Sequence, residues 1–139
     1  MYHEALGNAA FIAKVRIEGL RDYGAALSPF NAFQIIQGLE TLPIRVQKHS
    51  ENALALAQWL EQQDTVAWVN YPGLSSSKYY DLVTRYLPKG QRSVVTFGLK
   101  GGFEAAKKVA DETKLFSLLA NIGDTKSLII HPASTTHQQ

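Results

Sequence analysis

The hydrophobic pattern of this chain changes its period once, close to Asp64, and that change limits the folds open to it. Before this residue the apolar side chains recur at helical spacing, and after it short runs bounded by Gly and Pro predict strands between helices. The chain has 139 residues, of which 45% are hydrophobic. A chain of this size can bury roughly two-thirds of its unfolded surface. We therefore expect a single domain over 1–139, with a helical segment over 1–62 and an α/β sheet layer over 63–139.

Two helices are expected in the first 62 residues. One covers 9–23, with Gly24 where a C-terminal cap belongs. The other starts at Ser28, a good N-cap, followed by Pro29 at the first helical position. Pro43 falls inside this second helix, where a proline costs about 3 kcal/mol, yet the apolar face continues beyond it. We expect a long helix with a kink at Pro43 and not an end.

The remaining residues predict strands that alternate with helices. Strands are expected over 66–71, 94–99, 115–119 and 127–131. One helix is expected between an N-cap among serines 75 to 77 and the Pro-Lys-Gly run at 88–90. A second helix is expected over 103–112, with its inward side chains at Phe103, Ala106, Val109 and Ala110. Between the last two strands lies a turn in which Gly123 allows positive φ and Asp124 can hydrogen-bond its own backbone. The expected class is α/β (α+β), with a small, mostly antiparallel sheet of three or four strands covered by helices.

Charge and cysteine content exclude several classes of function. The net charge of +2 comes from Lys and Arg scattered among acids, so neither a nucleic-acid partner nor a membrane surface is indicated. The absence of cysteine excludes disulfides, thiolate metal sites and a Cys nucleophile. Residues 1–4 lack a signal pattern, and no apolar stretch approaches the ~20 residues of a membrane span. A cytoplasmic protein is expected.

For two weaker patterns we favour a structural interpretation over a ligand-binding one. The four histidines, His3, His49, His131 and His137, are separated and have no ligand-type partner at i, i+4, so we expect surface or packing roles and no metal. The Lys-Gly-Gly run at 100–102 precedes a helix and could hold a phosphate, but it lacks the spacing of the known phosphate-binding loops. A strand-to-helix turn is the expected structure there.

Several longer motifs occur in a fixed order along the chain. They are S-P-F-N-A-F at 28–33, G-L-E-T-L at 38–42, Y-P-G-L at 71–74, G-D-T-K-S-L at 123–128 and H-P-A-S at 131–134. Together they resemble the carboxyl part of the O-acetylhomoserine sulfhydrylases, within the pyridoxal-phosphate (PLP) enzymes of cysteine and methionine metabolism. Cystathionine synthases, cystathionine lyases and methionine γ-lyases share that architecture, but the N-I-G-D-T-K turn is more similar to the sulfhydrylases.

The resemblance implies a fold and an activity. The fold is the C-terminal small domain of a PLP fold-type-I transferase. The activity is that of a parent enzyme of methionine biosynthesis, which replaces the acetate of O-acetylhomoserine by sulfide to give homocysteine. The sequence does not distinguish sulfide from cysteine or methanethiol as the nucleophile.

The resemblance also implies three substrate-binding residues. Asn121 matches a position beside the substrate carboxylate, together with an arginine in a later strand that this sequence lacks. Ala120 matches a substrate-facing position, and Thr136 a hydroxyl-bearing position close to the cofactor lysine. On composition alone Asn121 is better explained as a residue that forms a turn than as one that binds substrate. Only the resemblance makes the substrate-binding interpretation the favoured one.

The cofactor lysine of the family lies in an S-x-T-K segment that this chain does not contain. The run Thr125-Lys126-Ser127 is not that segment, because it follows the carboxylate-binding position. We therefore expect no catalytic or cofactor-binding residue here, PLP only in the full-length parent, and no activity from this piece alone.

A missing neighbouring strand and an apolar stripe that includes Phe30 and Phe33 predict self-association into a homo-oligomer. The competing interpretation is a free-standing small α/β binding or oligomerisation module without catalysis. The reading frame on either side of the chain would separate the two.

Overall fold

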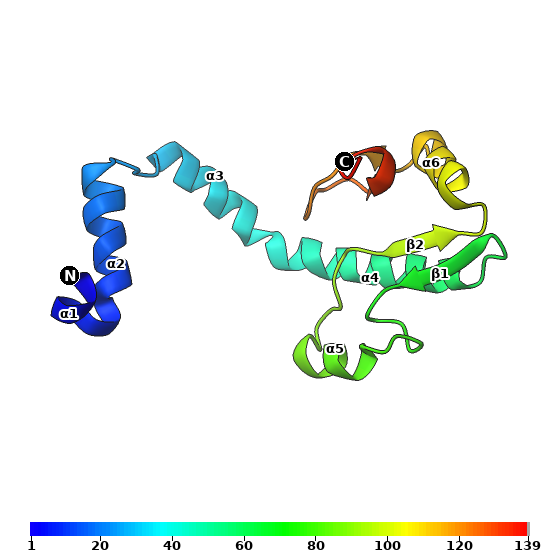
Figure 1. The fold of residues 1–139 in the computed structure, drawn as a ribbon, viewed down its shortest axis with the longest axis horizontal. Helices are drawn as coiled ribbons and strands as arrows, with labels where there is room; N and C mark the ends of the chain where they lie inside the picture. The colour runs from blue at the N-terminus through cyan, green and yellow to red at the C-terminus, as the bar shows by residue number, and fades with distance from the viewer. Residues whose placement is uncertain (139) are drawn as a thin grey trace. The chain divides into compact units, whose positions relative to one another are not determined.

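The computed structural model describes residues 1–138 and contains two compact units, Met1–Glu40 and the part from Thr41 onward (Figure 1). The first unit is helical. It comprises α1 (Tyr2–Leu6), a 3₁₀ turn (Gly7–Ala9), α2 (Ala10–Lys14), a π-helical continuation of α2 (Val15–Asp22) and α3 (Pro29–Glu40). None of the helices described in either unit has the length and apolar composition that crossing a bilayer requires.

Local sequence signals account for the helix ends in the first unit. The amide of Tyr23 donates to the carbonyl of Glu18, five residues earlier, and Gly24 then leaves the helix with φ 70°. Glycine adopts this left-handed conformation without a steric penalty. At the start of α3 the Ser28 hydroxyl accepts a 3.1 Å hydrogen bond from the amide of Asn31. The predicted glycine cap and the predicted serine cap are both confirmed.

No residue of the first unit is buried within the chain. Phe11 is 78% exposed, and Phe30 and Phe33 are 67% and 59% exposed. Aromatic side chains of this size normally contribute most of a core's burial. The unit therefore presents its apolar stripe to the surroundings and does not form a core of its own.

The single kinked helix expected around Pro43 is in fact two helices. Helix α3 ends at Glu40, Thr41 lies between, and α4 runs over Leu42–Glu61 with Pro43 in its first turn. A proline is tolerated there because the first amides of a helix have no intrahelical acceptor. The proline thus starts a new helix, whereas the apolar pattern on both sides suggested continuity.

The core of the second unit lies between α4 and an antiparallel pair of strands, β1 (Val66–Asn70) and β2 (Thr96–Leu99). Figure 1 shows this pair running alongside α4. The buried cluster consists of Ala53 and Ala57 from α4 with Tyr71 and Leu74 from the segment after β1. Alanine on the helix leaves room for the large Tyr71 ring, which is fully buried.

Two further helices follow the predicted order. Helix α5 covers Tyr80–Tyr86 and buries Val83, and α6 covers Gly102–Glu112 and buries Ala110. Phe103 and Val109, which we expected to face inward, are 49% and 37% exposed, so within the described residues they are only partly covered. Ala106 of the same face is half-buried.

The last strands form a separate sheet. Strands β3 (Ser117–Leu118) and β4 (Leu128–Ile129) pair in parallel, with hydrogen bonds of 2.9 Å from the Ser117 amide to the Ser127 carbonyl and 3.3 Å from Leu119 to Ile129. The described residues therefore hold two two-stranded sheets, and the single mostly antiparallel sheet that we expected is corrected. A 3₁₀ turn (Pro132–Ser134) follows β4.

Candidate functional site

The predicted site residues lie on the two loops that flank β4. Ala120 and Asn121 lie two and three residues after the end of β3, in the connection to β4. Thr136 lies beyond the 3₁₀ turn on the other side of β4. All three are exposed. The parallel pairing requires the connection between β3 and β4 to reverse the chain direction twice, and its turn determines where Asn121 can point.

The turn is built from hydrogen bonds made by the side chains of Asn121 and Asp124. The Asn121 Oδ1 atom accepts from the amide of Ile122 at 2.9 Å, and its Nδ2 donates to Oδ2 of Asp124 at 3.2 Å. The other carboxylate oxygen of Asp124 accepts from the amide of Lys126 at 3.0 Å. Gly123 lies between them at φ 78°, as the sequence predicted. Asn121 is therefore a turn-former, whatever else it does.

These hydrogen bonds also set the charge of the turn. The Lys126 amide, followed by the Asn121 side chain, lowers the pKa of the Asp124 carboxyl below its ordinary value. Both donors stabilise the ionised form, because each is better satisfied by a carboxylate than by a neutral acid. Asp124 is therefore a carboxylate at neutral pH, and it holds the Asn121 amide in a fixed direction.

Asn121 keeps one donor free for a ligand. Its amide group carries two N–H bonds, and one of them is used by Asp124. The second N–H has no acceptor within residues 1–138, so it can donate to an external oxygen. The arrangement suits a carboxylate bound on the side of the amide away from Asp124, where like-charge repulsion is smallest.

Thr136 does not share hydrogen bonds with Asn121. Its hydroxyl lies 2.8 Å from Nδ1 of His137, its neighbour in sequence, whereas the hydrogen bonds of the Asn121 side chain stay within its own turn. Ala120 offers only a methyl group and its backbone. The structure thus places all three residues on loops at either end of β4 without joining them through direct contacts.

A second polar cluster in this region was not predicted as such. His131, half-buried at the end of β4, packs edge-to-face on Phe103 with ring centroids 4.7 Å apart. Its Nδ1 lies 2.8 Å from the Ser134 hydroxyl, and its carbonyl accepts from the Thr135 hydroxyl at 2.9 Å. Packing on a neighbouring ring is one of the two roles, surface or packing, that we expected for the four histidines. The H-P-A-S-T run could have suggested the link to Ser134, because Ser and Thr after a proline favour such turns.

The described residues do not by themselves fit PLP or a metal ion. PLP binding requires an amine positioned for covalent attachment, and the lysine of these loops, Lys126, is exposed and serves the turn through its backbone. Two cavities of about 300 and 230 Å³ lie elsewhere, beside β1 and beside α4. Over residues 1–138 no three acidic or histidine side chains come together as metal ligands would.

Comparison with known proteins gives a consistent result. The family model for the Cys/Met metabolism PLP-dependent enzymes matches residues 4–139. The O-acetyl-L-homoserine sulfhydrylase of Leptospira meyeri is 59% identical over 133 residues, which are 95% of this chain and 30% of that protein. O-acetyl-L-homoserine sulfhydrylase 1 of Thermus thermophilus is 54% identical over 136 residues, 98% of this chain and 32% of that protein.

Solved structures agree with the sequence comparison. A Campylobacter jejuni structure described as an O-acetylhomoserine (thiol)-lyase and carrying a pyridoxyl-lysine phosphate superposes with a TM-score of 0.85 and 46% identity, over 97% of this chain and 32% of that one. The structure of an O-acetylhomoserine sulfhydrylase of Wolinella succinogenes superposes with a TM-score of 0.80 and 37% sequence identity, over 94% of this chain and 38% of that one. The chain spans about a third of the length of the relatives it matches. It belongs to the family of Cys/Met metabolism PLP-dependent enzymes.

Proposed function

We propose that this chain is the carboxyl-terminal part of an O-acetylhomoserine sulfhydrylase, and that the whole protein exchanges the acetate of O-acetylhomoserine for sulfide, giving homocysteine and acetate. The observation that carries the proposal is the 59% and 54% identity to two such enzymes over nearly the entire chain. We also propose that the chain forms one domain over 1–139, with a helical segment over 1–62 and an α/β layer over 63–139.

In this proposal the chain orients the amino acid and performs no bond-breaking step. The free N–H of Asn121 donates to the substrate carboxylate, while Asp124 fixes the amide from the other side. Ala120 borders the substrate chain, and Thr136 offers a hydroxyl on the opposite loop. Holding the substrate in one orientation lowers the barrier because reacting groups no longer have to find each other. The cofactor and its lysine belong to the rest of the protein.

The proposed partners are the amino-acid substrate and further copies of the same chain. Self-association is supported by the exposed phenylalanines of the first unit, since apolar surface of this kind is usually covered by a partner. We also propose a cytoplasmic location, in keeping with a metabolic role and with the absence of cysteine.

A chimaera tests the proposal. The matching 133 residues of the Leptospira meyeri relative are replaced by this chain, and homocysteine formation from O-acetylhomoserine and sulfide is measured. We expect a PLP-loaded, active chimaera, while the isolated chain forms no homocysteine and keeps no PLP absorbance after dialysis. A folded, PLP-loaded chimaera without activity would favour the alternative, a module that binds or oligomerises without catalysis. Competing sulfide against methanethiol in the same assay identifies the nucleophile.

A further inference from the structure

His131 lies at the centre of the loop that follows β4. Its backbone carbonyl accepts hydrogen bonds from the Ser134 amide at 3.1 Å and from the Thr135 hydroxyl at 2.9 Å. The Ser134 hydroxyl lies 2.8 Å from Nδ1 of the His131 ring and 3.3 Å from the His131 carbonyl oxygen. The chain after β4 therefore folds around this one residue, which contacts both the backbone and the side chain of Ser134.

The two contacts of the Ser134 hydroxyl place the proton of the His131 ring. A hydroxyl group has one hydrogen and can donate only once. When it donates to the His131 carbonyl, its oxygen can accept from an Nδ1–H group, and both contacts are then hydrogen bonds. Donation to Nδ1 instead would leave the 3.3 Å contact without a hydrogen. The proton of the ring is therefore on Nδ1, where it is present in the neutral and in the charged ring alike.

The ring of His131 also joins the loop to α6. It packs on Phe103, in the first turn of that helix, with ring centroids 4.7 Å apart and an angle of 77° between the ring planes. Edge-to-face pairs of this kind are stabilising and favour one mutual orientation of the rings. The hydrogen bond at Nδ1 and the contact with Phe103 together fix the direction of the half-buried His131 side chain.

Thr136 is held between two hydrogen bonds of the same loop. On one side of it, the Thr135 hydroxyl donates to the His131 carbonyl. On the other side, the amide of His137 donates to the carbonyl of Pro132 at 2.9 Å. Thr136 itself is exposed, and its hydroxyl lies beside Nδ1 of His137. The backbone around Thr136 is therefore fixed while its side chain stays accessible.

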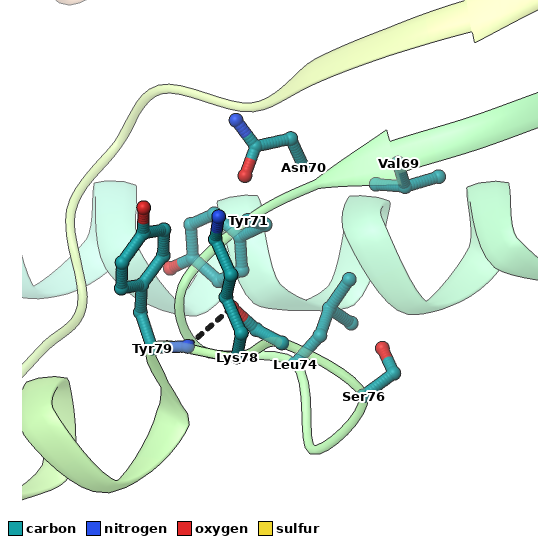
Figure 2. A pocket seen from close by; sticks show the side chains of 8 residues that line it. Val69, Asn70, Tyr71, Leu74, Ser76, Lys78 and Tyr79 are labelled. Carbon is teal, nitrogen blue, oxygen red and sulfur yellow. Dashed lines mark hydrogen bonds between the residues drawn. The ribbon is translucent and has the colours of Figure 1, made fainter.

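The cavity of about 300 Å³ beside β1 differs from this loop in what it offers a ligand (Figure 2). Its lining includes Tyr71 and Leu74, which are 0% and 3% exposed and so present no surface for binding. The loop around His131, in contrast, combines a fixed backbone with the exposed hydroxyl of Thr136.

We infer that His131 is a positioning residue for the sulfhydrylase reaction. Held by Ser134 and Phe103, it fixes the loop that presents the Thr136 hydroxyl to O-acetylhomoserine, and it does not touch the substrate itself. This inference rests on the proposed function, because the substrate is the one proposed for the whole protein. A loop that is fixed before binding loses less conformational entropy when the substrate arrives, which strengthens binding.

Steady-state kinetics of the chimaera test the inference. Ser134→Ala should raise the KM for O-acetylhomoserine about two- to tenfold and change kcat and the KM for sulfide less than about twofold. Ser134→Thr keeps a hydroxyl and should restore the KM. His131→Phe keeps a ring on Phe103 but loses Nδ1, so it should match Ser134→Ala, and the double variant should be no worse than either single variant. Ser93→Ala, at an exposed position before β2, is the control.

Amide hydrogen exchange of the 139-residue chain supplies a readout that needs no catalysis. Ser134→Ala should speed exchange at the His137 amide about two- to tenfold, because the loop that this amide closes is loosened. The Lys100 amide, bonded to the Thr65 carbonyl at 2.9 Å, should exchange at an unchanged rate.

The two readouts separate this inference from the proposed function. A chimaera without activity would contradict the proposed function, and the exchange rate at His137 would still decide whether His131 fixes the loop. The inference is overturned if Ser134→Ala leaves that exchange rate unchanged. It is also overturned if, in an active chimaera, Ser134→Ala leaves the KM for O-acetylhomoserine unchanged or Ser134→Thr fails to restore it.

Discussion

The hydroxyl of Tyr71 donates a 2.9 Å hydrogen bond to the carbonyl oxygen of Arg92, 21 residues later in the chain. The same hydroxyl lies 3.4 Å from the carbonyl of Ser50 in α4. Arg92 has a φ of 90°, a left-handed conformation that a side-chain-bearing residue rarely adopts. Such residues persist where surrounding contacts hold them. The fully buried tyrosine is therefore the link that ties the segment before β2 to the core.

Removing this hydroxyl should destabilise the second unit. Tyr71→Phe leaves the Arg92 carbonyl without its donor, and we expect the free energy of unfolding to fall by roughly 1–3 kcal/mol. Chemical denaturation monitored by circular dichroism measures the change. Tyr86→Phe, at a 68% exposed position, is the matched control and should stay within about 0.5 kcal/mol. Equal stability of both variants and the unaltered chain would contradict the role of the bond.

The same residue predicts a loss of stability at alkaline pH. Burial raises the pKa of the Tyr71 hydroxyl above its ordinary value. In the unfolded chain tyrosine ionises near pH ~10, while the folded chain retains the proton. The stability that the protonated Tyr71 hydroxyl contributes is therefore fully present below about pH 10 and is lost as pH rises through the folded-state pKa. Denaturation series above pH 10 should show this slope, and Tyr71→Phe should reduce it.

The turn at Asp124 should respond to acid in the opposite sense. The Lys126 amide lowers the pKa of this carboxyl, so the turn is stabilised above the ordinary aspartate pKa of about 3.9 and loses that stabilisation as pH falls through the folded-state value. The amide proton shift of Lys126 should follow this titration in NMR spectra. Asp124→Asn should abolish it. A Lys126 shift that titrates at the ordinary pKa would show that the hydrogen bond is not maintained in solution.

Asn121 should affect substrate binding more than turnover. In the active chimaera, Asn121→Ala should raise the apparent KM for O-acetylhomoserine by a free-energy change of roughly 1–3 kcal/mol, because a hydrogen bond to a charged group is lost. Steady-state kinetics with varied amino acid measures it. Gln62→Ala, an exposed amide at the end of α4, is the control. Unchanged kinetics for Asn121→Ala would remove this residue from the carboxylate site.

The exposed phenylalanines of α3 should drive self-association of the isolated chain. Replacing Phe30 and Phe33 with Asp should shift the molar mass measured by light scattering at micromolar concentration toward that of a monomer, because a charged side chain is costly to bury in an apolar contact. Tyr86→Asp, equally exposed on α5, should leave the mass unchanged. A monomer in the unaltered chain would refute the proposed association.

Features that depend on a few neighbouring residues were determined by the sequence. The Ser28 cap, the positive φ of Gly24 and the turn at Gly123 appear where local chemistry predicted them. Strand β1 and helix α6 fall within one residue of their predicted bounds, whereas α5 begins later than the predicted serine cap. These features need no distant contact, since a cap or a left-handed glycine is favourable in any surrounding structure.

Features that join distant residues were decided only by the tertiary structure. The parallel pairing of β3 with β4 could not be predicted because two-residue strands carry no periodicity that indicates their partner. The hydrogen bond from Tyr71 to Arg92 joins a tyrosine at the end of a strand to a backbone carbonyl in a loop. Nothing in the sequence around either residue indicates the other as its partner. The sequence determined that Asn121 lies in a turn, but only the fold directs one of its two N–H donors to Asp124 and leaves the second for a ligand.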